Sequence, residues 1–181
     1  DALRCHFIGH SIGYGIYQLD PSASVKQIEK VNNICSYGIA MGIIELYVTD
    51  YLKGDFGNNE TLKGICPNNT RGGCNHALGH VLLVAKDGDI NQTLENCKTF
   101  GTKFRNKNCF SGVFMEHISP INLIAHGLAN NSWLKRTARF GELEKLCRSY
   151  SGDEASTCWG ELARAADDNY NQDIKKVLGF C

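Results

Sequence analysis

The number and placement of the cysteines constrain the fold more than any other feature. Nine cysteines occur among 181 residues, and no two of them form a Cys-x-x-Cys motif. The absence of that motif argues against zinc ribbons, thioredoxin-type redox sites and c-type haem attachment. A cysteine content this high is typical of proteins in oxidising compartments, where the thiols pair. We therefore expect a fold that disulfides hold together.

Other features agree with an oxidising compartment. Asn-x-Ser/Thr sequons stand at Asn59, Asn68, Asn91 and Asn130 and make the chain a candidate glycoprotein. No signal peptide is found, so we expect the chain to begin after processing. The most apolar stretch, residues 34–48, is interrupted by a glutamate and is too short to span a bilayer, so we expect a buried helix there. These features predict a secreted or otherwise extracytoplasmic protein, at a cell surface or in a periplasm-like compartment, that does not span a membrane.

The charge composition excludes one class of partner. Lys+Arg and Asp+Glu both number 19, and no basic cluster is interleaved with aromatic residues. Such a chain has no net field to attract a polyanion, so we do not expect binding to nucleic acid.

Three segments resemble one another and predict a repeat architecture. Their first helices contain His6-Phe-Ile-Gly-His10, His76-Ala-Leu-Gly-His80 and Asn122-Leu-Ile-Ala-His126. Short second helices are expected at residues 25–31, 92–97 and 142–147. The closing helices contain Cys35-Ser-Tyr-Gly38, Cys109-Phe-Ser-Gly112 and Cys158-Trp-Gly160. Short helices bury little surface alone but can stack on their neighbours. We expect a single all-α domain, a small helical array of about three imperfect helix-hairpin repeats braced by disulfides.

The repeat boundaries follow from this alignment. The first repeat spans residues 1–53 and the second spans 74–118. An exposed insertion rich in Gly and Asn, 54–73, separates them, and the third repeat spans 119–181. A Ser-Pro pair at its start is a typical helix N-terminus.

Four glycines in the first repeat are spaced like a packing stripe. Gly9 and Gly13 lie one turn apart on one expected helix, and Gly38 and Gly42 do so on another. Glycine within a helix costs roughly 1 kcal/mol relative to Ala. A close approach of two helix backbones would explain their presence, and helix ends are the alternative.

Alignment of the repeats also predicts the disulfides. Cys97–Cys109 and Cys147–Cys158 occupy matching positions, each with one cysteine ending a helix and the other beginning the next. Of the remaining cysteines, we expect the pairs Cys5–Cys35 and Cys66–Cys74, while Cys181 stays free, binds a small thiol or links to another chain in a homo- or hetero-assembly. Metal ligation or nucleophilic catalysis by these cysteines is the alternative.

Four of the six histidines form two His-x-x-x-His pairs, His6 with His10 and His76 with His80. Residues i and i+4 lie on one helix face, so both rings of a pair can bind one ion. The two pairs would form one four-nitrogen site if their faces converge, which we favour, and two sites otherwise. In the third repeat Asn122 replaces the first histidine.

Further residues are candidates for completing such a site. Met41 and Met115 each follow the glycine of a Cys-x-x-Gly segment by three residues. Thioether sulfur is a soft ligand that suits copper. Core packing is the ordinary role of a buried methionine and is the alternative for Met41 and Met115. Glu116 and His117 offer harder ligands, which would suit zinc or iron.

Three functions remain open. The first is an extracytoplasmic protein that binds copper or zinc through the histidine pairs. The second is a structural or interaction subunit of a surface assembly, in which the histidines only pack. The third is a metal-dependent hydrolase or oxidase, in which Glu45, Glu116 or Glu161 could act as general base to a metal-bound water. No other catalytic motif is found, and the sequence indicates no substrate.

Overall fold

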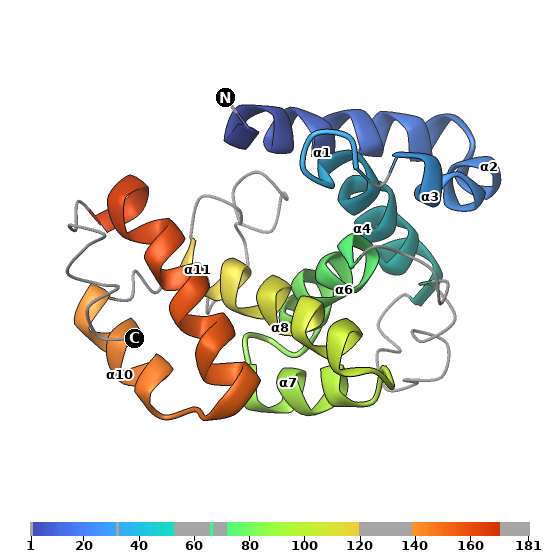
Figure 1. Cartoon of the computed structure of the whole chain (residues 1–181). Coiled ribbons are helices and arrows are strands. Elements are labelled where there is room, and N and C mark those ends of the chain that lie inside the picture. Colours follow the sequence, from blue (N-terminus) through green and yellow to red (C-terminus); the bar gives the residue numbers. More distant parts are fainter. Residues whose placement is uncertain (1, 32, 53–65, 67–71, 120–138, 171–181) are drawn as a thin grey trace.

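The computed structural model describes residues 2–31, 33–52, 66, 72–119 and 139–170. All of their regular structure is helical, as the sequence predicts. The helices are α1 (Ala2–Leu19), α2 (Pro21–Lys26), α3 (Ile28–Val31), α4 (Gly38–Leu52), α6 (Gly73–Ala85), α7 (Ile90–Lys98), α8 (Lys103–Ile118), α10 (Phe140–Arg148) and α11 (Gly152–Tyr170) (Figure 1).

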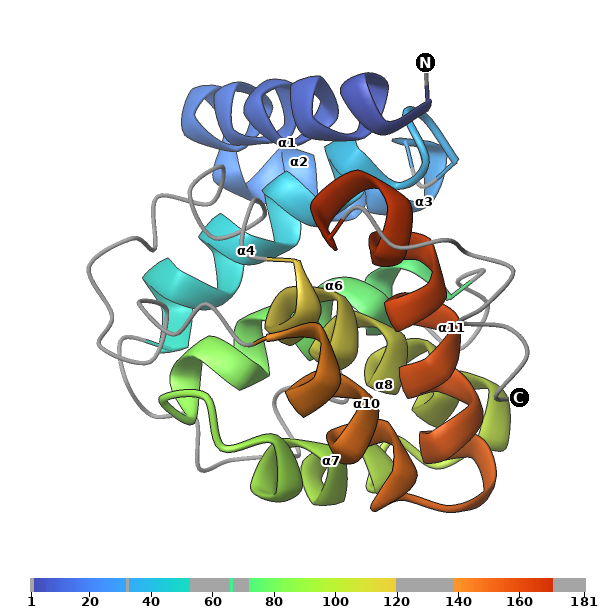
Figure 2. The same cartoon turned by 90° about the vertical axis from the view of Figure 1, so that its left-hand side faces the viewer.

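The long helices pack in the order in which they occur along the chain. Helix α1 packs on α4, α4 on α6, α6 on α8, and α8 on α11. The shorter helices α7 and α10 lie against α8 and α11. Figures 1 and 2 show α1 along one edge of the molecule and α7 and α10 near the opposite edge. The arrangement is the helical array that the repeats predict.

Local signals in the sequence account for the short helices. The Asp20 side chain accepts a hydrogen bond from the backbone N–H of Ala23, and proline follows it at the start of α2. The Asp89 side chain accepts in the same way from Gln92 at the start of α7. Both are N-caps, which satisfy backbone donors that the helix itself leaves open.

The helix expected at residues 34–48 begins later than its apolar pattern suggests. Cys35, Ser36 and Tyr37 all have positive φ, and α4 starts only at Gly38. Left-handed residues cannot continue a right-handed helix, so the chain turns here. Ile34 is 47% exposed, but residues 39–45 are buried as predicted.

Four disulfides brace the array, and they join the pairs that the repeat alignment predicts. They are Cys5–Cys35, Cys66–Cys74, Cys97–Cys109 and Cys147–Cys158. One expectation was wrong in detail, because Cys109 and Cys158 lie in the second turn of α8 and α11 and do not begin those helices. Each of these two disulfides therefore fastens a short helix to the side of a long one.

The glycine stripe brings α1 and α4 into backbone contact. A methyl group added to Gly38 or Gly42 would overlap the carbonyl oxygen of His6 or His10, and one added to Gly9 would lie 2.9 Å from the Ile39 nitrogen. Glycine is therefore required for packing at this crossing, which confirms the packing interpretation.

The same kind of crossing joins α6 to α8. There Gly112 lies against the carbonyl oxygen of His76, and Gly79 lies against that of Cys109. The helix pairs α1–α4 and α6–α8 thus share one packing motif.

Side chains from the successive helices form one hydrophobic core. Its fully buried members include Ile43 of α4, Leu78 and Leu82 of α6, Phe114 of α8 and Leu162 of α11. No helix among the described residues is long and apolar enough to cross a membrane.

Several sequence-based predictions lie outside the described residues. They are the sequons at Asn59, Asn68 and Asn130, the thiol of Cys181, the third-repeat positions Asn122 and His126, and most of the insertion 54–73.

Candidate metal centre

The first histidine pair lies on α1 and turns its side chains toward each other. The Nε2 atoms of His6 and His10 are 3.2 Å apart, and their rings meet edge to face with centroids separated by 4.8 Å. Both side chains are buried, His10 almost completely. The i,i+4 spacing on a helix produces this contact.

The outer ring nitrogens of this pair are bound to acceptors. His6 Nδ1 lies 2.8 Å from the carbonyl oxygen of Ser36, and His10 Nδ1 lies 3.2 Å from the Glu45 carboxylate. The Ser36 carbonyl only accepts, and the Glu45 carboxylate does so when it is ionised, so with Glu45 ionised each Nδ1 carries the proton. In neutral rings both Nε2 atoms then present lone pairs, and these face each other across 3.2 Å.

The second pair, on α6, repeats this geometry. His76 and His80 have their Nε2 atoms 3.0 Å apart and their ring centroids 4.8 Å apart. His80 Nδ1 is bound to the carboxylate of Glu116, which is completely buried. In each pair, therefore, the second histidine is oriented by a glutamate from the closing helix of the same repeat.

The glycine crossings explain how these glutamates reach the histidines. Gly38 lies against the backbone carbonyl of His6 and Gly112 against that of His76, so the two helices of each pair are in close contact at the histidines. Glu116 follows Gly112 by one helical turn, whereas Glu45 follows Gly38 by two. The equivalent roles are therefore hidden in an alignment of the repeats, and only the contact identifies Glu45 as the partner of His10.

Tyr14 is a site residue that sequence reasoning missed. Its hydroxyl donates to the Glu45 carboxylate at 2.5 Å, so Tyr14 and His10 share one acceptor oxygen. Burial first, and then the charge of Glu45 and this hydrogen bond, raise the pKa of Tyr14, and the charge of Glu116 raises it further. Tyr14 therefore belongs to the site through its contact with Glu45. Its place on the histidine face of α1, one turn after His10, was the available signal.

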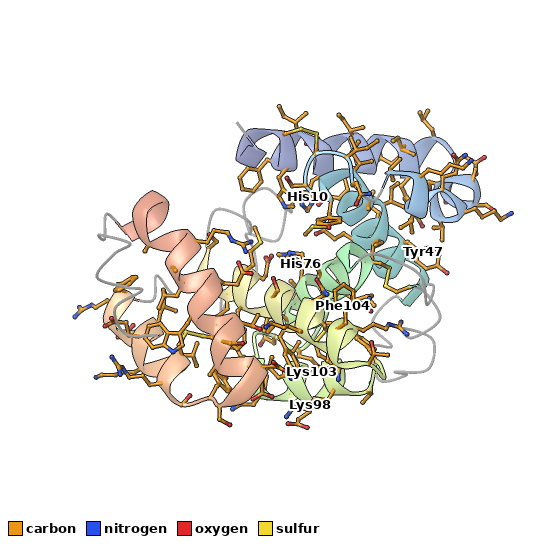
Figure 3. All side chains as sticks on the ribbon, in the orientation of Figure 1. His10, Tyr47, His76, Lys98, Lys103 and Phe104 are labelled. Carbon is orange, nitrogen blue, oxygen red and sulfur yellow. A yellow bond between two sulfur atoms is a disulfide. The ribbon has the colours of Figure 1, made fainter. Side chains whose placement is uncertain are left out.

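The surroundings of His76 shift its pKa clearly. Burial lowers the pKa of His76 well below its ordinary value, and the charges of His80, His6, Arg164 and His10 lower it further. Figure 3 shows His10 below α1 and His76 at the α6–α8 pair, facing the same interior region.

The expected four-nitrogen site is not formed. In the described part of the chain, no three His, Cys, Asp or Glu side chains are grouped so that they could hold one ion. The pairs lie on two different helices, α1 and α6, and α4 packs on both of them. The structure therefore presents two neighbouring two-nitrogen modules, which we name the first module (His6, His10, Glu45) and the second module (His76, His80, Glu116).

Helix α11 adds a third carboxylate beside the second module. Glu161 is buried, accepts a hydrogen bond from the Ser111 hydroxyl at 2.6 Å and lies 3.4 Å from the Arg164 guanidinium. Burial raises the pKa of Glu161, while the charges of Arg164 and His80 and the Ser111 hydrogen bond act in the opposite direction. Glu161 thus differs from the other two glutamates in that no histidine hydrogen bond orients it here.

The remaining sequence candidates lie on the same helices. Met41 is fully buried in the hydrophobic core, whereas Met115 and His117 are partly buried on α8, on either side of Glu116. Their ligation of a metal remains a prediction.

Chemically, each module offers two imidazole Nε2 atoms within 3.2 Å of each other and a carboxylate bound to Nδ1 of the second ring. Such a set can bind a transition metal or hold a proton between the rings. Comparison of the chain with protein-family models, curated proteins and solved structures found no match.

Proposed function

We propose that this protein is an extracytoplasmic metal-binding protein that holds copper or zinc through its two histidine pairs. His6 and His10 are the ligands of the first module, and His76 and His80 are those of the second.

The single observation that carries the proposal is the close approach of the two Nε2 atoms in the first module, 3.2 Å apart. With Glu45 ionised, both Nδ1 atoms of this module donate, one to a carbonyl and one to a carboxylate, so two neutral rings bring their Nε2 lone pairs together. Two facing lone pairs repel, and a cation between them removes the repulsion. A metal ion is one such cation, and a proton that converts one ring to imidazolium is the other.

The nitrogen spacing favours a metal with angled ligands. For zinc–nitrogen bonds of about 2.0–2.1 Å, two ligands of a tetrahedral site are about 3.3 Å apart. The observed separations of 3.2 and 3.0 Å are close to that value. A linear two-coordinate ion would need about twice the bond length, about 4 Å. Zinc or copper(II) with further ligands therefore suits the modules better than linear copper(I).

The buried glutamates support the same proposal. A histidine that binds a metal through Nε2 commonly donates its Nδ1 proton to a carboxylate, which sets the tautomer and makes the ring a better ligand. Glu45 stands in this relation to His10, and Glu116 to His80.

A purely structural role is the second candidate, and the second module favours it. There a proton on His76 Nε2 could be donated to His80 Nε2, which closes the contact without any metal. A hydrolase or oxidase is the third candidate, because two protein ligands leave coordination positions open and Glu161 lies nearby. We put both behind metal binding, because a structural role requires one ring of the first module to be protonated and the third candidate requires a metal as well.

Metal analysis separates these functions. The disulfide-bonded protein would be purified without chelators, incubated with zinc or copper(II), dialysed and analysed for metal. We expect about two ions per chain, and close to none in the variant that combines His10→Gln with His80→Gln. His117→Gln is the matched histidine control on α8, and a loss of metal in it would add His117 to the ligands. Equal metal contents in the wild type and the double variant would overturn the proposal, provided that circular dichroism shows both to be folded.

We further propose that the protein is secreted and glycosylated. Four disulfides among the described residues support an oxidising environment, which is where acceptor sequons are modified. Asn91 is exposed on α7. Expression through a eukaryotic secretory pathway should give a glycan at Asn91, and the variant Asn91→Gln should migrate as a smaller protein. Identical migration before and after glycosidase treatment would refute glycosylation.

A further inference from the structure

We propose that the disulfide Cys5–Cys35 is a redox-sensitive link, which a dithiol cleaves before the other described disulfides and whose cleavage releases the segment that orients His6. Only the last consequence, the loss of an ion from the first module, rests on the proposed function.

Accessibility sets this disulfide apart from the other three that join described residues. Cys5 and Cys35 are both partly exposed, whereas each of the six cysteines in the other three disulfides is at most 2% exposed. Thiol–disulfide exchange begins when a thiolate attacks a disulfide sulfur, so it requires access to that atom, and exposed disulfides are the more easily reduced ones. A dithiol in solution should therefore react first at Cys5–Cys35.

Cys35 begins a segment with an uncommon backbone conformation. Cys35, Ser36 and Tyr37 have φ angles of 52°, 51° and 71°. The Cβ atom makes this left-handed region unfavourable for residues other than glycine, and such residues keep it where their surroundings hold them there. Two of the bonds that tie this segment to α1 are the disulfide to Cys5 and the hydrogen bond that His6 Nδ1 donates to the Ser36 carbonyl. Reduction removes the covalent one, so residues 35–37 become free to leave the left-handed region.

The disulfide and the hydrogen bond of His6 join neighbouring residues on both sides. Cys5 directly precedes His6 in α1, and Cys35 directly precedes Ser36 in the turn before α4. The Ser36 carbonyl lies 2.8 Å from His6 Nδ1 and orients the His6 ring. When the segment changes its backbone conformation, this carbonyl turns away and His6 loses its acceptor. The disulfide therefore controls the orientation of His6.

The opening stays local, because the rest of the α1–α4 crossing does not depend on this disulfide. Gly42 lies against the backbone carbonyl of His10, one turn further along both helices. His10 also keeps its bond to Glu45, which is two turns into α4. Reduction should therefore displace His6 and leave His10 in place.

The proposed step is a two-electron exchange between thiols and a disulfide. A thiolate of the dithiol attacks one sulfur of Cys5–Cys35 and forms a mixed disulfide, and the other cysteine leaves as a thiolate that takes up a proton. The second thiol of the reductant then displaces the remaining cysteine. Cys5 and Cys35 end as two thiols, and the dithiol is oxidised to a cyclic disulfide.

Limited reduction of the wild-type protein tests the first part of the inference. Free thiols would be blocked, dithiothreitol added, and newly formed thiols alkylated at intervals and mapped by mass spectrometry. We expect Cys5 and Cys35 to be labelled about tenfold faster than the cysteines of the other three described disulfides. Equal labelling rates, or earlier labelling of a buried pair, would overturn the inference.

Hydrogen exchange tests whether the link holds the segment. The backbone N–H groups of Gly38 and Met41 donate to the carbonyl oxygens of Cys35 and Tyr37, so their exchange reports on its conformation. In the variant Cys5→Ser/Cys35→Ser these two amides should exchange about tenfold faster than in the wild type, while the amides of α6 keep their rates. Diethyl pyrocarbonate, which modifies accessible imidazoles, should also modify His6 faster in this variant.

The matched control is Cys147→Ser/Cys158→Ser, which removes a buried disulfide between α10 and α11 and should leave both amides unchanged. If Gly38 and Met41 exchange at the same rates with and without Cys5–Cys35, the disulfide does not hold the segment and the inference fails.

Zinc analysis separates this inference from the proposed function. The variant Cys5→Ser/Cys35→Ser should bind one ion where the wild type binds two. If it still binds two with unchanged affinity, the disulfide does not control the first module. If neither protein binds zinc but labelling and exchange change as expected, the proposed function fails and the redox-sensitive link stands.

Discussion

Replacing Glu116 by Gln tests whether the second module is built for a metal or only for packing. Glu116 is fully buried, and its carboxylate accepts the Nδ1 proton of His80. Glutamine has nearly the same shape, and its amide oxygen can accept the same proton. The substitution therefore removes the negative charge behind the imidazole and keeps the hydrogen bond.

The two interpretations predict different magnitudes for this variant. Loss of a carboxylate that supports a metal-bound histidine typically lowers affinity 10- to 100-fold, or about 1.4–2.8 kcal/mol. The free energy of unfolding of the metal-free protein should fall by less than this loss of binding free energy. The amide makes a weaker hydrogen bond than the carboxylate, but burying an amide avoids the cost of burying a charge. We expect a large effect on zinc binding by the second module and a small one on unfolding.

The assay is zinc titration by calorimetry, accompanied by urea unfolding of the metal-free protein. Glu95→Gln is the matched control. Glu95 is 69% exposed and pairs with Lys98 on the surface of α7, where such an ion pair contributes about 0–1 kcal/mol. Equal zinc affinities for wild type and Glu116→Gln, together with a loss of stability, would refute the metal interpretation of the second module.

Three further substitutions test other parts of the argument. Gly112→Ala should destabilise the protein by about 1–3 kcal/mol, because its methyl group would overlap a carbonyl oxygen of α6, whereas Gly160→Ala, which meets open space within α11, should stabilise it by about 0.5–1 kcal/mol. Urea unfolding measures both, and equal effects would contradict the close crossing. Tyr14→Phe removes the second donor to Glu45, so it should lower the free energy of unfolding by about 1–3 kcal/mol. Because Glu45 then accepts from His10 without competition from Tyr14, the zinc affinity of the first module should rise several-fold. If both values are unchanged, Tyr14 does not belong to the site. Burial raises the pKa of Glu161, so the folded protein keeps the proton of this carboxyl group at pH values where the unfolded chain has lost it. The free energy of unfolding therefore falls as pH rises from about 4.5 through the folded-state pKa. Glu161→Gln should therefore gain in melting temperature over the wild type as pH increases from 4 to 7, and a difference that does not vary with pH would refute the assignment.

The features that the sequence predicts correctly depend on short-range geometry. Two histidines four residues apart on a helix must share a face, so the contacts His6–His10 and His76–His80 follow from spacing once the helix is recognised. The pairs Cys97–Cys109 and Cys147–Cys158 follow from their matching positions in two repeats, and Cys5–Cys35 and Cys66–Cys74 join cysteines that remain. The glycine stripe follows from its four-residue period, which places small residues along one line of the helix surface.

The features that it predicts incorrectly, or not at all, depend on the relation between helices. Three left-handed residues delay the start of α4, although the apolar pattern begins earlier. Glu45 and Glu116 hold equivalent histidines from different turns, because the histidine–carboxylate contact depends on how each helix pair is packed and turned. Alignment of the repeats cannot find such a correspondence.

The sequence alone therefore determined the helical class, the disulfide pairs and the two histidine pairs, since these depend on residue spacing along the chain and on the match between repeats. Only the tertiary structure decided which carboxylates orient the histidines, that Tyr14 joins them, and that the pairs form two neighbouring modules rather than one four-nitrogen site. The physical reason is that the packing of α4 on α6 fixes the distance between the pairs, and that packing depends on buried side chains from every repeat.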